Sequence, residues 1–194
     1  MDQESTICKE IVSDMIHKVE EESEKNIEQL TVIISRSSIQ GGLANEEFDE
    51  HDLIDWRLQH QYPTNYVKIW KNYEKVGDDS KFTDIRSKDN PVDKAEGKKM
   101  TGGVTLSPSR DTGAGREFNE SNLNQCFDIN KHYYLYDRGD INDETITFIV
   151  YWIPIDIIKK WYHESGNKKG KITEKKLKEY INKCNISETI WDRS

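Results

Sequence analysis

The amino-acid sequence predicts an α/β protein of the α+β kind, in which a mixed central β-sheet with a β-hairpin is flanked by helices and preceded by an N-terminal helical region. Apolar residues recur at helical spacing over residues 7–34, alternate around a turn at 77–80, and form a nearly continuous apolar run over 145–153. With 194 residues the chain has single-domain length. We expect one domain, with residues 1–62 helical and 63–194 carrying the sheet.

The N-terminal region is predicted to be helical and acidic. One long helix, or two abutting ones, is expected from Ile7 to Ile34, and a further helix from Asn45 to Gln61 that ends at Pro63. Residues 1–60 hold 15 acidic and 5 basic side chains, a net charge of -10, whereas residues 61–194 hold 21 and 23, a net charge of +2. The overall charge of -8 therefore does not exclude a nucleic-acid ligand for the second part.

The second part of the chain predicts a hairpin, a long loop and a buried strand. The hairpin strands are expected at Tyr66–Tyr73 and Lys81–Ser87, because a Gly-Asp-Asp turn signal separates two β-rich stretches. Glycine and proline mark residues 88–118 as a loop, and a loop this long is more often functional or mobile than filler. The later predicted elements are a helix at Ser121–Tyr136, a turn at 137–140, a buried strand at Thr145–Ile153, and helices at Ile155–Tyr162 and Thr173–Cys184.

The hairpin brings charged residues together. Pairing centred near Asp79 sets Glu74 opposite Asp84 and Asn72 opposite Arg86, and directly opposed residues project to one face of the sheet. Residues two apart on a strand share a face as well, so the two acids and the arginine are expected to form one polar cluster. Two carboxylates can hold a hard cation such as Mg²⁺, and a neighbouring cation can steady charge on a phosphate. An ordinary cross-strand ion pair on a wet sheet face is the alternative reading.

These residues resemble the restriction-endonuclease-like, or PD-(D/E)xK, nuclease superfamily. In that family one acid comes from the first strand of a hairpin, and a second acid and a lysine two residues later come from the next strand. The stretch Asp84-Ile-Arg86, with Glu74 upstream, looks like this motif. The resemblance covers residues 64–165 in element order.

The match departs from the family pattern at two positions. Arg86 stands where the family has lysine, and Glu74 stands where it has an aspartate after proline, with Asp78 and Asp79 as alternatives for that acid. Guanidinium is bulkier than ammonium and stays protonated, so Arg86 favours charge stabilisation over the handling of a water molecule.

A second literal E-x-K occurs in the sequence at Glu96-Gly97-Lys98, and Asp84 lies twelve residues before it. Because this triplet falls in a segment that does not read as a strand, the hairpin residues are the preferred set.

The loop that follows the hairpin has the composition of a phosphate-contacting segment. Glycine lets backbone amides approach phosphate, and hydroxyl and basic side chains supply further donors. The candidate DNA-binding residues are Lys98, Lys99, Ser107, Ser109, Arg110 and Arg116.

The resemblance implies a Mg²⁺-dependent restriction-type endonuclease that hydrolyses phosphodiester bonds in double-stranded DNA. Its catalytic residues would be Glu74, Asp84 and Arg86, with the metal on the first two. A homodimer formed through the acidic N-terminal helix would cut both strands. Two alternatives stay open: an inactive relative that binds DNA without cutting it, and a non-enzymatic acidic interaction or inhibitor protein that acts as a DNA mimic.

The cellular setting is expected to be cytoplasmic, without a membrane. The longest apolar run, Ile146–Ile155, is half of the roughly 20 residues that a spanning helix needs. Cys8, Cys126 and Cys184 lie far apart, with no C-x-x-C pair, which favours a reducing compartment.

Overall fold

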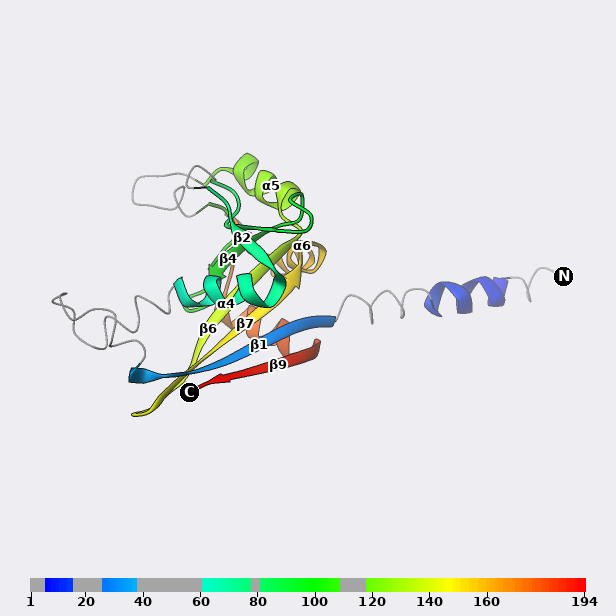
Figure 1. Cartoon of the computed structure of the whole chain (residues 1–194). Coiled ribbons are helices and arrows are strands. Elements are labelled where there is room, and N and C mark those ends of the chain that lie inside the picture. Colours follow the sequence, from blue (N-terminus) through cyan, green and yellow to red (C-terminus); the bar gives the residue numbers. More distant parts are fainter. Residues whose placement is uncertain (1–5, 16–25, 38–60, 78–80, 109–117) are drawn as a thin grey trace.

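The computed structural model describes residues 6–15, 26–37, 61–77, 81–108 and 118–194. In this part of the chain a mixed sheet of seven strands, in the order β2-β3-β4-β6-β7-β1-β9, lies beside a small two-stranded sheet, β5-β8 (Figure 1). Helices surround the large sheet. The predicted α/β architecture is therefore confirmed.

The bounds of the elements are as follows. The strands are β1 (Asn26–Ser35), β2 (Tyr73–Lys75), β3 (Ile85–Ser87), β4 (Lys94–Lys99), β5 (Val104–Thr105), β6 (His132–Ile141), β7 (Thr145–Pro154), β8 (Lys171–Ile172) and β9 (Asn185–Arg193). The labelled helices are α4 (Tyr62–Lys71), α5 (Glu120–Ile129), α6 (Ile155–Glu164) and α7 (Glu174–Asn182). A further helix covers residues 6–15.

The large sheet buries apolar side chains on both faces. On one face, Val67 of α4 is buried in a cluster with side chains of most of the strands, including Tyr134. On the other face, α5, α6 and α7 contribute Leu123, Ile158 and Leu177 to a second cluster. Burial of this apolar area is the main stabilising contribution to a fold of this kind.

The strand directions follow from the connections. β3 is antiparallel to β2 and to β4, and β6, β7 and β1 form an antiparallel series. β4 and β6 run parallel, and the chain between them passes through α5, as parallel pairing requires a crossover. The predicted buried strand at 145–153 is confirmed as β7, an interior strand between β6 and β1.

The predicted helix at Ile7–Ile34 is wrong in its second half. A helix does cover residues 6–15, but Asn26–Ser35 is strand β1, in which Leu30, Val32 and Ile34 are buried on one face. This segment is rich in β-branched residues, which pack well on the pleated surface of a sheet, and its side chains are buried alternately. Both features favour a strand over a helix. Residues 38–60, which include nearly all of the predicted helix at Asn45–Gln61, lie outside the described residues.

The predicted strand at Tyr66–Tyr73 is also wrong, because residues 66–71 belong to α4 and only Tyr73 lies in a strand, β2. Pro63 lies in the first turn of this helix, where its missing N–H is not needed. Helix α4 ends at Lys71, and the residue that follows, Asn72, adopts a left-handed conformation with φ of 58°. The hairpin is confirmed as the antiparallel pair β2 and β3, with strands shorter than expected.

Four further features differ from the sequence prediction. The segment 88–118 contains β4 and β5 and is not a continuous loop. The predicted helix at Ser121–Tyr136 ends at Ile129, and the predicted turn at 137–140 lies within β6. The helices predicted at Ile155–Tyr162 and Thr173–Cys184 are confirmed as α6 and α7, while the C-terminal strand β9 was not predicted.

Candidate functional site

Glu74 and Arg86 face each other across β2 and β3. The register sets Glu74 opposite Arg86, so the expectation that Glu74 lies opposite Asp84 is wrong. Nε of Arg86 donates to Oε1 of Glu74 at 2.8 Å, and both side chains are 43% exposed. Ion pairs this open to water contribute at most about 1 kcal/mol to stability. Their geometry is that of a cross-strand surface pair.

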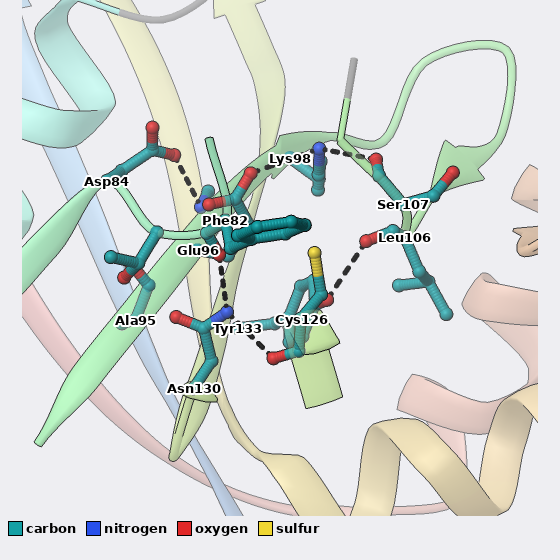
Figure 2. Close-up of polar contacts among 12 residues, drawn as sticks. Phe82, Asp84, Ala95, Glu96, Lys98, Leu106, Ser107, Cys126, Asn130 and Tyr133 are labelled. Atoms are coloured by element: carbon teal, nitrogen blue, oxygen red, sulfur yellow. Dashed lines mark hydrogen bonds and ion pairs between the residues drawn. The ribbon is translucent and has the colours of Figure 1, made fainter. Parts of the chain in front are cut away.

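Asp84 uses its carboxylate on the other neighbouring strand. The backbone N–H of Gly97 in β4 donates to Oδ2 of Asp84 at 2.9 Å (Figure 2), and the N–H of Asp84 donates to the carbonyl of Ala95 at 3.1 Å. The carboxylate thus accepts a strand N–H that a backbone carbonyl would ordinarily accept. This contact fixes Asp84 against the middle residue of the Glu96-Gly97-Lys98 triplet.

Glu96 and Lys98 form a buried ion pair on β4. They lie two residues apart on one strand and therefore share a face, with Nζ of Lys98 3.1 Å from Oε1 of Glu96. Their side chains are only 8% and 12% exposed. The ammonium group also donates to the carbonyl of Ser107 at 3.1 Å (Figure 2). Such additional partners are what make a buried charge tolerable.

The electrostatics of this cluster centre on Glu96. Burial, and to a lesser degree the negative charge of Asp84, raise the pKa of its carboxyl to about 7 against the opposing effect of Lys98. Two neighbouring carboxylates repel each other when both are ionised, and a cation that binds to both relieves this repulsion. A hard cation bound there would compete with the proton, which Glu96 holds about half of the time at neutral pH.

Gly97 is required by the packing behind the strand. A Cβ atom at this position would overlap the ring of Tyr134 on the adjacent strand β6. The hydroxyl of Tyr134 shares a hydrogen bond of 3.0 Å with Oγ1 of Thr64 in α4. The glycine therefore lets an aromatic ring lie across β4 and link the strand to the helix behind it.

The chain before Asp84 is fixed from α5. Nδ2 of Asn130, at the C-terminal end of that helix, donates to the carbonyl of Phe82 at 2.7 Å and to that of Cys126 at 2.9 Å. Asn130 is 1% exposed, so water cannot replace these bonds. The result is a rigid approach to the carboxylate two residues further on.

The donor set suits magnesium better than zinc. Among the described residues no group of three or more His, Cys, Asp or Glu side chains converges on one point. Mg²⁺ characteristically binds one or two carboxylates and keeps several waters or substrate oxygens. Asp84 and Glu96 would supply the two carboxylates of such a site.

The structure separates the other predicted residues. Lys98 lies in the buried cluster, while Lys99 beside it is exposed. Ser107 is 1% exposed and meets Lys98 through its carbonyl. The predicted contacts Ser109, Arg110 and Arg116, and the alternative acids Asp78 and Asp79, lie outside the described residues.

Comparisons with known proteins give no family. No protein-family model, no curated protein and no solved structure matches the chain. Within the described residues, no helix has both the length and the hydropathy needed to cross a bilayer.

Proposed function

We propose that the protein is a Mg²⁺-dependent endonuclease of restriction type that hydrolyses phosphodiester bonds in double-stranded DNA through Asp84, Glu96 and Lys98. The observation that carries the proposal is the buried Glu96–Lys98 pair beside the Asp84 carboxylate. It supports the nuclease resemblance at a second set of residues, with one acid immediately before β3, and an acid and a lysine two residues apart on the next strand, β4.

Each side chain has a role that its surroundings favour. Asp84 and Glu96 would hold the ion, which when bound acts as a Lewis acid and lowers the pKa of coordinated water. Lys98 would orient the attacking water and offset negative charge on the phosphate, a task that suits a compact ammonium group better than guanidinium. In this arrangement Lys98, and not Arg86, takes the role that the family gives to its lysine.

Arg86 keeps a place in the proposal as a phosphate contact. It lies opposite Lys94, which shares a strand face with Glu96 and Lys98. Its guanidinium therefore extends the line of positive charge away from the buried pair. Such contacts position a duplex without reading its sequence.

The decisive experiment is cleavage of supercoiled plasmid with Mg²⁺, with and without a chelator. We expect Asp84→Asn, Glu96→Gln and Lys98→Met to lower the rate at least about 100-fold, since each removes a group that acts in the transition state. Glu74→Gln is the matched variant, and we expect its rate to stay close to that of the wild type.

Two results would redirect the proposal. Full activity of Glu96→Gln together with loss of activity in Glu74→Gln would return the site to Glu74, Asp84 and Arg86. Gel-shift binding to DNA without cleavage by the wild type, in Mg²⁺ or Mn²⁺, would favour an inactive relative.

Cutting both strands of a duplex calls for two such sites, so we propose a homodimer as the unit that makes double-strand breaks. Light scattering on the protein with and without a short duplex tests this. Linear plasmid produced directly by a stable dimer supports it, and nicked circles produced by a monomer contradict it.

A further inference from the structure

We propose that Tyr133 is a positioning residue for Lys98, acting through the backbone of Leu106 and Ser107. The catalytic part of this inference rests on the proposed nuclease function. The positioning itself concerns the protein alone and can be measured without DNA.

Two hydrogen bonds connect the tyrosine to the lysine. The hydroxyl of Tyr133 donates to the carbonyl of Leu106 at 2.9 Å, and Nζ of Lys98 donates to the carbonyl of Ser107 at 3.1 Å (Figure 2). The two acceptors belong to consecutive residues, so fixing the first restricts the rotation available to the second.

The segment that carries these carbonyls is held from other sides as well. The N–H of Leu106 donates to the carbonyl of Gly170 at 2.7 Å. Ser107 precedes Pro108, and a residue before proline is confined to extended conformations. The tyrosine hydroxyl thus adds a side-chain hydrogen bond to these backbone restraints.

Burial makes the orientation of the ammonium sensitive to this contact. Tyr133 and Leu106 are fully buried, and Ser107 is 1% exposed. An ammonium group that loses a hydrogen-bond acceptor at a buried site has little water available as a replacement acceptor. Burial also holds the pKa of the Tyr133 hydroxyl far above its usual range, so the group remains a donor.

The opposite face of the same strand supplies a matched control. Tyr134 is also fully buried, but its hydroxyl bonds to Thr64 of α4 instead of the 106–107 segment. Tyr133→Phe and Tyr134→Phe therefore remove the same atom from neighbouring residues. Only the first removes the restraint on the acceptor of Lys98.

The test combines kinetics with ¹H–¹⁵N spectra of the lysine ammonium groups, in which Lys98→Met assigns the signal of Lys98. In the wild type we expect a slowly exchanging Lys98 signal. In Tyr133→Phe we expect that signal to broaden or vanish and kcat for plasmid cleavage to fall about tenfold, with KM for DNA unchanged. Tyr134→Phe should keep both.

The outcomes separate the two proposals. An unchanged Lys98 signal and unchanged kcat in Tyr133→Phe overturn the positioning role, even if the protein is a nuclease. If the Lys98 signal is lost in Tyr133→Phe but the wild type cuts no DNA, the positioning of Lys98 is supported and the nuclease proposal is wrong. If Tyr133→Phe does not fold, Pro108→Ala loosens the same segment and should weaken the Lys98 signal, and an unchanged signal there counts against the inference.

Discussion

Lys98 and Glu96 meet at 3.1 Å with little solvent around them, whereas Arg86 and Glu74 meet at 2.8 Å in the open. The shorter distance belongs to the weaker interaction, because water and salt screen an exposed pair. Loss of one partner from the buried pair leaves an uncompensated charge and is strongly destabilising. Burial, more than distance, therefore makes Glu96 and Lys98 the residues to test.

The first prediction concerns stability against pH. The pKa of Glu96 is 4.5 in an unfolded chain, and burial raises it to about 7 in the folded protein. Its contribution to stability is therefore full below pH 4.5 and is lost as the pH rises through 7, by about 3 kcal/mol in total. In urea melts with chelator, the wild type should lose stability relative to Glu96→Gln between pH 5 and pH 8. Parallel curves for the two proteins would contradict the raised pKa.

The second prediction concerns Mg²⁺. A cation that binds only the folded protein raises its stability, by about 2.7 kcal/mol at 100 times Kd. We expect Mg²⁺ to raise the melting temperature of the wild type and of Glu74→Gln, and to leave Asp84→Asn unchanged. The effect should be larger at pH 8 than at pH 6, because Glu96 must release its proton to bind the ion. Equal shifts in all three proteins would place the ion elsewhere.

The third prediction concerns acid sensitivity at His132. Its ring stacks on Trp152 at 4.5 Å between centroids, and burial together with the charge of Lys71 lowers its pKa to about 4, against the opposing charges of Asp93 and Glu28. Because the folded protein disfavours the protonated ring, the contribution of His132 to stability is present above pH 6.5 and is lost as the pH falls through 4.

We therefore expect the wild type to lose more stability than His132→Phe between pH 6.5 and pH 4. Thermal melts across this range measure the difference. Equal losses would mean that His132 is protonated as easily in the folded protein as in the unfolded chain.

The fourth prediction concerns the close packing of β4. Gly97→Ala forces a methyl group into the ring of Tyr134, and overpacking of this kind costs about 1–3 kcal/mol. Gly77→Ala is the control, since nothing lies within 4 Å of a Cβ atom there. Urea denaturation should show a clear loss for the first variant and little change for the second. A loss of equal size in both would point to backbone effects of alanine.

Much of the fold could be predicted from the sequence where local pattern and tertiary environment agree. The strand at Thr145–Pro154 carries its β-branched and aromatic residues into an interior position, and α6 and α7 begin where expected. Thr173 caps α7 by accepting from the N–H of Lys176, which is a local signal. Elements of this kind need no knowledge of their neighbours.

Strand β4 shows why the site was harder to place. The segment Lys94–Lys99 has neither alternating apolar residues nor a β-branched side chain, so no local signal marks it as a strand. Its strand conformation depends on pairing with β3 and β6, and on Tyr134 lying over Gly97. The spacing of Asp84 from Glu96 and Lys98 was visible in the sequence, but only tertiary pairing brings the three together.

The position of β1 has a consequence for how the chain reaches its folded state. This strand pairs with β7, where Glu28 lies opposite Trp152, and with β9, where Asn26 lies opposite Asn185. Both pairings join residues more than a hundred positions apart. Closing such long loops costs chain entropy, which the contacts of β1 offset only once they form. We therefore expect β1 to be ordered late in folding, after β6 and β7 have paired. Strand β9 should be ordered with β1 or after it, because β1 is its pairing partner at the edge of the sheet.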